Sequence, residues 1–252
     1  MKTNLLQKTR QGFTLIELMV VIVILASLGA ISYSVILSQK DAGEIEKTRQ
    51  NLGSIGNAME NFKTEYKSYP SDRTAETIQE KAGDIDYGAL TGEFSNCYLR
   101  QLLHSSSGVE EKTFYAYANA GGVMSSEGDN RIAKGRGLEK GETGFAYVML
   151  KEDRQDPSMK GAVSAKNPLV LAPVYPSTQP YDGDKVAFDI TSYKGKVFVY
   201  RAGTGSVDTV SDLKEDETDE DRATLSEESN FYPEDKRGRT FPERFVILPP
   251  EL

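Results

Sequence analysis

Tryptophan is absent from this 252-residue chain, and cysteine and histidine occur once each, as Cys97 and His104. A single cysteine excludes an intrachain disulfide, and because free thiols are unusual outside the cytoplasm, we expect Cys97 to be buried. A single histidine excludes a zinc site built from two or more histidines. His104 follows Leu102 and Leu103, where a helix is expected to end, so it is a poor candidate for the base of a serine hydrolase. The sequence therefore predicts that the protein is not an enzyme.

Positive charge is also scarce, because 30 Lys and Arg residues face 38 Asp and Glu residues, giving a net charge of -8. An acidic chain lacks the electrostatic footprint of a nucleic-acid binder, so no direct nucleic-acid partner is expected. The composition, 38% hydrophobic and 27% charged, is that of a soluble domain, so any membrane segment must be local. The length suits one such segment and one globular domain.

The one long uncharged run lies near the N-terminus. Residues 1–12 contain Lys2, Lys8 and Arg10 but no acid, and residues 18–37 carry no charge at all. About 20 apolar residues are enough for a helix to cross the hydrocarbon layer. Basic residues before the run and acids after it predict a single membrane pass with the N-terminus in the cytoplasm.

Glu17 stands at the edge of this run, where a carboxylate is costly and usually has a partner. If the chain is cut between Gly12 and Phe13, the new α-amine of Phe13 becomes a candidate cation. That amine cannot easily meet its own Glu17 across one helical turn, but it can meet the Glu17 of a neighbouring copy, neutralising both charges and fixing the stagger of two parallel helices. The alternatives are a carboxylate that stays at the interface or is protonated, and a secretory signal peptide cut after Ala30 or Ser32, which leaves Glu17 unexplained.

The segment Gly12-Phe13-Thr14-Leu15-Ile16-Glu17, followed by eight apolar residues, resembles the prepilin signature of type IV pilins and type II secretion pseudopilins. The resemblance covers residues 8–40. It implies that a prepilin peptidase cuts after Gly12 and N-methylates Phe13, and that Glu17 is needed for assembly. It also implies a filament whose core is made of the apolar helices, extracted from the inner membrane by an assembly ATPase and a platform protein.

Beyond Lys40, apolar residues recur at spacings of 7, 3, 4, 3 and 4, at Ile45, Leu52, Ile55, Met59, Phe62 and Tyr66. This is the stripe of an amphipathic helix, so a single helix is predicted from Phe13 to about Tyr66. The helix should end before Pro70. Lys67-Ser68-Tyr69-Pro70 resembles the segment that closes the long helix of major pseudopilins, with Lys67 where that family often has glycine.

The remainder predicts short helices, loops and strands. We expect helices at residues 74–82 and 96–104, mostly loop at residues 105–138, and a hairpin formed by residues 193–201 with residues 205–207. The strand candidates are residues 145–150, 169–174, 186–190, 196–201 and 245–248. A few strands against one long helix predict an α+β, pilin-like domain with a small antiparallel sheet and long loops.

An acidic stretch at residues 212–228 is predicted to be solvated and mobile. Because major pseudopilins hold Ca²⁺ in a late loop, the resemblance makes calcium a possible ligand, there or at the weak candidates Asp182, Asp184 and Asp189, whose oxygens suit this ion. No other metal or cofactor is expected.

These observations predict a structural subunit of a pilus or pseudopilus filament. The alternative is a membrane-anchored domain that does not polymerise and that binds a ligand with the aromatics and loops of residues 105–140. The expected partners are other subunits, the prepilin peptidase, the assembly platform and, before assembly, membrane lipid; the domain would face the periplasm or the cell surface. The predicted parts are a leader at 1–12, a transmembrane and filament-core helix at 13–40, its amphipathic continuation at 41–70 and a globular domain at 71–252.

Overall fold

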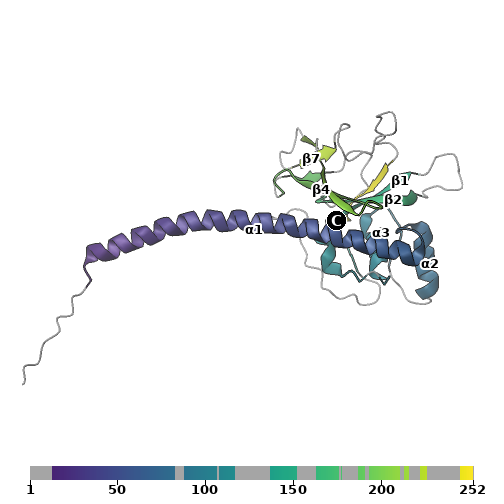
Figure 1. Ribbon diagram of the computed structural model, residues 1–252, viewed down its shortest axis with the longest axis horizontal. Coiled ribbons are helices and arrows are strands. Elements are labelled where there is room, and N and C mark those ends of the chain that lie inside the picture. Colours follow the sequence, from purple (N-terminus) through teal and green to yellow (C-terminus); the bar gives the residue numbers. More distant parts are fainter. Residues whose placement is uncertain are drawn as a thin grey trace, which may run out of the picture. The chain divides into compact units, whose positions relative to one another are not determined.

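A computed structural model describes residues 13–82, 88–106, 108–116, 137–151, 163–175, 177, 187–190, 193–210, 213–215, 222–225 and 245–251 (Figure 1). The chain divides into two compact units between Ala42 and Gly43, and each is described here by itself. The predicted boundaries of the leader, helix segments and globular domain stay predictions.

The predicted long helix is confirmed as α1, which runs from Leu15 to Tyr66. It ends where Lys67 takes a left-handed backbone conformation, with φ of 59°. A left-handed residue is a common way for a helix to end, and glycine is the residue that adopts this conformation most readily. The membrane crossing predicted for residues 13–40 is not confirmed, because no helix among the described residues is both long and apolar enough to span a membrane.

In the second unit, the predicted apolar stripe of α1 is confirmed by burial. Leu52, Ile55, Met59 and Phe62 are fully buried, and Ile45 is nearly so. Two shorter helices follow close to their predicted positions, α2 at Asp72–Ala82 and α3 at Ser95–Leu103, and a 3-10 turn, η1, spans Glu111–Phe114.

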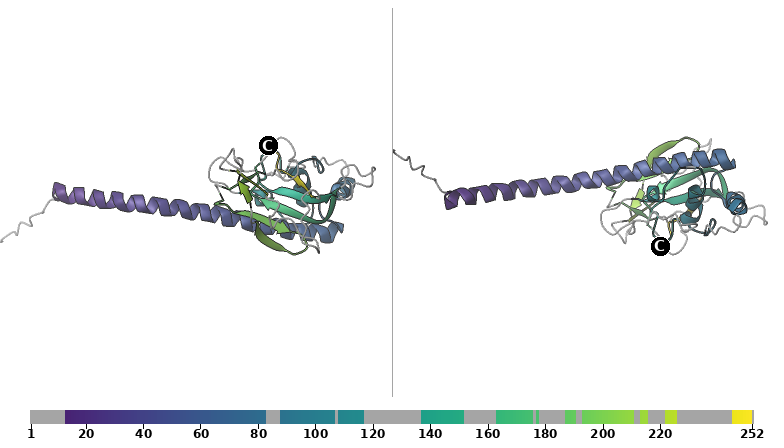
Figure 2. Two further views of the ribbon diagram at one scale, coloured as in Figure 1. Left: turned by 90° about the horizontal axis from the view of Figure 1, so that it is seen from above. Right: turned by 90° about the horizontal axis from the view of Figure 1, so that it is seen from below.

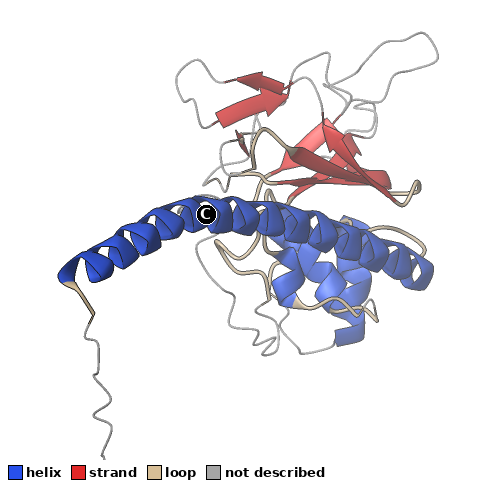
Figure 3. Cartoon of the chain, turned by 60° about the vertical axis from the view of Figure 1, so that its left-hand side comes forward, coloured by secondary structure: helices blue, strands red, loops and turns tan. Residues whose placement is uncertain are grey.

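The main sheet has five strands in the order β5-β4-β2-β1-β8, all antiparallel to their neighbours. Figure 3 draws the strands in red. The strands are β1 (Ala146–Lys151), β2 (Val163–Ala172), β4 (Val197–Arg201), β5 (Ser206–Val210) and β8 (Phe245–Leu248). The predicted hairpin is confirmed as β4–β5, preceded by a tight turn in which both Lys194 and Gly195 have positive φ. Strand β2 begins six residues earlier than predicted, since its first half pairs with the end of β1 beyond an irregularity at Val148–Leu150.

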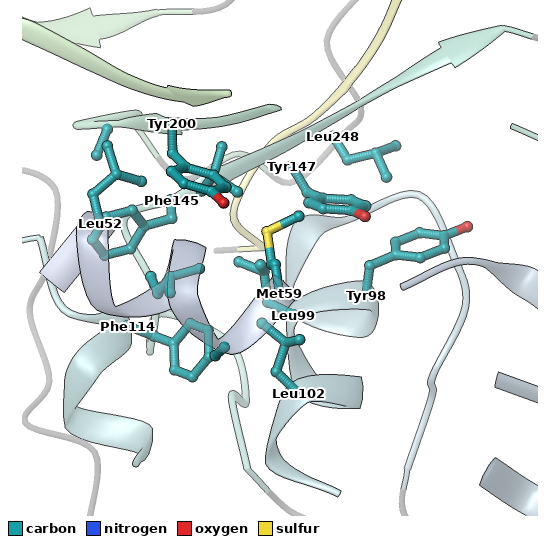
Figure 4. Packing of buried hydrophobic residues seen from close by; sticks show 14 of the residues in the cluster. Leu52, Met59, Tyr98, Leu99, Leu102, Phe114, Phe145, Tyr147, Tyr200 and Leu248 are labelled. Atoms are coloured by element: carbon teal, nitrogen blue, oxygen red, sulfur yellow. The ribbon is translucent and has the colours of Figure 1, made fainter. Parts of the chain in front are cut away.

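The two faces of this sheet build two cores. Side chains such as Tyr147 and Tyr200 face the second half of α1 and α3, with Phe114 of η1 closing the same cluster (Figure 4). Alternate residues such as Val148 and Val199 point to the other face and pack with Phe188 and Leu225. Two further views show the sheet beside the second half of α1 (Figure 2). The α+β architecture with an antiparallel sheet is thus confirmed.

The second face is covered by a small antiparallel sheet with the order β3-β7-β6. Its strands are β3 (Phe188–Asp189), β6 (Leu213–Glu215) and β7 (Arg222–Leu225). The prediction of a solvated, mobile stretch over residues 212–228 is therefore wrong for β6 and β7. Leu225 is buried in the second core and Ala223 is buried as well, and burial of these apolar side chains outweighs the solvation of the neighbouring charges.

Candidate functional site

The start of α1 is closed by a reciprocal pair, Thr14 and Glu17. The Glu17 carboxylate oxygen Oε2 accepts hydrogen bonds from the backbone N–H and the hydroxyl of Thr14, both at 2.8 Å. In return, the Thr14 hydroxyl oxygen accepts the backbone N–H of Glu17 at 3.3 Å. This is a capping box, which satisfies backbone donors that the first turn leaves unpaired.

The capping box gives Glu17 a role within its own chain that the sequence analysis missed. The pattern Thr-x-x-Glu at residues 14–17 was the available signal. Glu17 lies in the first helical turn, where the helix dipole favours a negative charge. Both hydrogen bonds from Thr14 go to one carboxylate oxygen, Oε2, so they leave the other oxygen, Oε1, as an acceptor for a second partner.

The helix beyond Glu17 is apolar around its whole circumference. From Leu15 to Leu28 its large apolar side chains are all exposed, at 45% or more of their surface. A helix that is apolar on every side is normally buried in protein or in lipid, and an exposed apolar surface of this kind marks an interaction site. Residues 15–28, with Thr14 and Glu17 at their start, are therefore the candidate assembly segment.

The predicted cleavage site lies at the start of this segment. Phe13 precedes the helix and is 83% exposed, so its backbone is not packed against the rest of the unit. Gly12 lies outside the described residues. The cleavage between the two, the N-methylation of Phe13 and the intermolecular role of Glu17 stay predictions.

The calcium candidates do not form a described site. Asp182 and Asp184 lie outside the described residues, and Asp189 belongs to β3, where its backbone pairs with Arg222 of β7. Among the residues that the structure describes, no group of three or more Asp, Glu, His or Cys side chains could hold a metal ion.

The residues proposed for the rival ligand-binding role pack inward where they are described. Phe114, Tyr115 and Ala116 are all buried, so these aromatics contribute to the core and do not form an exposed binding surface. Cys97 is buried as predicted. His104 caps the C-terminal end of α3 as predicted, and burial, followed by the nearby Arg100 charge, lowers its pKa to about 4.

Glu60 ties α1 to the β4–β5 hairpin. Its Oε1 accepts hydrogen bonds from the Tyr69 hydroxyl at 2.8 Å, the Tyr200 hydroxyl at 3.0 Å and the Gly203 N–H at 3.0 Å. Partial burial raises the pKa of this carboxyl, but these hydrogen bonds and the Lys63 charge outweigh burial and hold the pKa below its ordinary value. These hydrogen bonds of Glu60 therefore hold the β4–β5 hairpin against the second half of α1.

Comparison with known proteins defines the class of the N-terminal segment. The prokaryotic N-terminal methylation motif matches residues 7–33, a range that includes Gly12, Phe13 and Glu17. The chain therefore carries the prepilin-type N-terminus that its sequence resembles.

Two relatives point to a more particular group. The chain is 34% identical over 65 residues to type II secretion system core protein G of Pseudomonas aeruginosa, covering 26% of this chain and 46% of that protein. It is 36% identical over 67 residues to the protein of the same name from Aeromonas hydrophila, covering 26% of this chain and 47% of that protein. The chain thus matches about half the length of these relatives, and no solved structure matches it.

Proposed function

We propose that this chain is a structural subunit of a pseudopilus or type IV pilus-like filament, assembled through residues 13–40. It enters the inner membrane with its N-terminus in the cytoplasm and its globular domain outside, as the charge distribution around the uncharged run favours. A prepilin peptidase removes residues 1–12 and methylates Phe13. The assembly platform then transfers the helix from lipid to neighbouring subunits.

One observation carries the proposal: Glu17 stands in the first turn of a helix whose apolar side chains are exposed on every side. Moving this helix from lipid into a bundle of identical helices exchanges one apolar surrounding for another, so apolar contact alone does not fix the register. A charge pair between the Glu17 carboxylate and the Phe13 amine of the next subunit supplies both neutralisation and register.

Cleavage creates the cation that this pairing needs. Hydrolysis of the Gly12–Phe13 peptide bond leaves a free α-amine on Phe13, and methylation of that amine keeps its positive charge. The Thr14 contacts hold one oxygen of Glu17 inside its own chain, so the second oxygen is the one that meets the neighbouring amine.

The test is the intact mass and N-terminal sequence of the mature protein recovered from membranes in which a prepilin peptidase is co-expressed. We expect a chain that begins at Phe13 and carries one methyl group. A chain that begins at Met1, or beyond Ala30, would contradict the proposal and indicate a plain anchor or a cleaved secretory signal.

The assembly step is tested with Glu17→Gln, which keeps the size of the side chain and removes its charge. We expect normal membrane insertion and processing, with filament yield reduced at least tenfold. Glu46→Gln is the matched control, because Glu46 lies exposed on the same helix and its described contacts are local ones at the surface, with Arg49 at 3.8 Å and the side-chain amide of Gln50 at 3.5 Å. Equal filament yields from both variants would support an anchored domain that does not polymerise.

A further inference from the structure

Glu111 is a buried carboxylate that takes no part in the proposed filament assembly. It opens η1 and is 1% exposed. Its Oε1 accepts the backbone N–H of Leu138 at 3.3 Å. Its other oxygen, Oε2, is buried and has no hydrogen-bond partner among the described residues. An ionised carboxylate buried without a compensating donor or cation is strongly unfavourable.

A second carboxyl group, that of Glu142, lies close to Glu111 and belongs to the loop at residues 137–145. The Glu142 carboxyl lies beside that of Glu111, because the two accept hydrogen bonds from the N–H groups of consecutive residues: Glu142 Oε2 from Glu139, and Glu111 Oε1 from Leu138. Two carboxylates in contact repel, and a proton on one of them turns this repulsion into a hydrogen bond that supplies the missing donor.

Among the described residues, the nearby charged side chains do not neutralise the Glu111 and Glu142 carboxylates. Arg100 of α3 lies close by, but it donates its hydrogen bonds to the backbone carbonyls of Gly137, Leu138 and Ala89. Lys112 pairs with Glu110 at the surface. On the loop itself, Glu139 adds a further negative charge.

A further cation of the described part of this loop, Lys140, binds the C-terminal segment. Its ammonium group lies 2.9 Å from a carboxylate oxygen of Glu251. Among the described residues, therefore, neither carboxyl of the Glu111–Glu142 pair forms an ion pair.

We propose that Glu142 carries a proton that it donates to the buried Oε2 of Glu111, and that losing this proton loosens the 137–142 loop and the C-terminal segment that this loop anchors. The anchor consists of the Gly141 N–H donating to the Glu251 carbonyl at 2.8 Å, together with the Lys140 contact. Asn96 joins the two parts, donating to the Glu139 carbonyl at 2.8 Å and accepting the Glu251 N–H at 2.8 Å.

The direction of the pH dependence follows from the shift of Glu142. Burial raises its pKa and, against the opposing Glu139 N–H hydrogen bond, the Glu111 carboxyl raises it further, from 4.5 to about 7. The folded protein therefore holds this proton more tightly than the unfolded chain. The resulting stabilisation is complete below about pH 4.5, is lost as pH rises toward 7, and is absent above it.

The experiment is hydrogen–deuterium exchange of the full chain in detergent micelles with a chelator present, from pH 5 to 8.5, read at peptides covering residues 137–142 and 247–252. After correction for intrinsic exchange, we expect protection to fall as pH rises to 7, by at most tenfold per unit for one linked proton. Peptides of the second half of α1 should change less.

Glu142→Gln places a permanent N–H donor where the proton of Glu142 lies. We expect its protection at both peptides to lose the pH dependence and to stay near the wild-type value at pH 5. Glu110→Gln is the matched control, because it removes a charge one residue from Glu111 but leaves the pair intact, so the wild-type profile should remain.

A wild-type profile without the decline, or a Glu142→Gln profile that keeps it, would overturn the proposal. If Glu142→Gln does not fold, Glu111→Gln makes the same test from the other member of the pair, because it also removes the like-charge contact. A Glu111→Gln profile with the wild-type decline contradicts the proposed hydrogen bond from Glu142 to Glu111.

Discussion

Gly56 shows how a single residue sets the distance between α1 and the sheet. A Cβ atom added to Gly56 would overlap the ring of Tyr200, whose hydroxyl binds Glu60 one helical turn further on. At Gly43, also in α1, an added Cβ would meet nothing within 4 Å. The two glycines look alike in the sequence, where both weaken the helix, but only Gly56 is needed for a close approach.

We predict opposite effects for alanine at these two positions. Gly56→Ala should destabilise the domain by about 1–3 kcal/mol, because the Tyr200 ring must move and its bond to Glu60 weakens. Gly43→Ala should stabilise the helix by up to about 1 kcal/mol, since alanine restricts the unfolded chain and clashes with nothing. Urea unfolding of the full chain, followed by tyrosine fluorescence, measures both. Destabilisation of similar size in the two variants would show that the close approach is not what Gly56 provides.

At the scale of the element, the capping box makes the start of α1 testable separately from assembly. Thr14→Val keeps the shape of the side chain and removes the hydroxyl that binds Glu17, so the first turn should lose about 1 kcal/mol. Thr14→Ser keeps the hydroxyl and should behave as wild type. Exchange rates of the Glu17 and Leu18 amides in micelles measure the difference. Equal exchange in both variants would mean that the hydroxyl does not hold the turn.

Helices were predictable from this sequence because each one repeats its signal over several turns. The stripe from Ile45 to Tyr66 predicted both the extent of α1 and the face that it buries. The strands β4 and β8 were predicted nearly residue for residue, since each is a run of apolar residues. In contrast, β6 has three residues within an acidic stretch, too few to show alternation, and its place depends on pairing with β7.

The candidate site was predictable in part for a similar reason. A carboxylate at the edge of an uncharged run singled out Glu17 without any structure. Thr14 was missed because one hydroxyl carries little signal until the start of the helix is known. The Glu111–Glu142 pair could not be predicted, because these residues lie 31 positions apart in the sequence and meet only through the fold.

At the scale of the molecule, two carboxyl groups whose pKa values are shifted in opposite directions predict how the stability of the domain depends on pH. Hydrogen bonds from Gly203 and two tyrosines hold the pKa of Glu60 below its ordinary value despite partial burial. The stability contributed by Glu60 is therefore present above about pH 4.5 and is lost as pH falls through the lowered pKa. Glu142, whose pKa is raised to about 7, contributes stability below about pH 4.5 that is lost as pH rises to 7.

We therefore predict that the domain is most stable at around pH 5, between the ranges in which the two groups lose their contributions. Thermal unfolding of the full chain in micelles from pH 3 to 8.5 should trace a curve with two declining limbs. The decline at low pH comes from Glu60 and the decline above pH 5 comes from Glu142. Glu60→Gln should therefore flatten only the acidic limb, and Glu142→Gln only the limb above pH 5. A substitution that flattened both limbs equally would show that net charge, −8 for the whole chain, sets the pH dependence through general repulsion instead of these two sites.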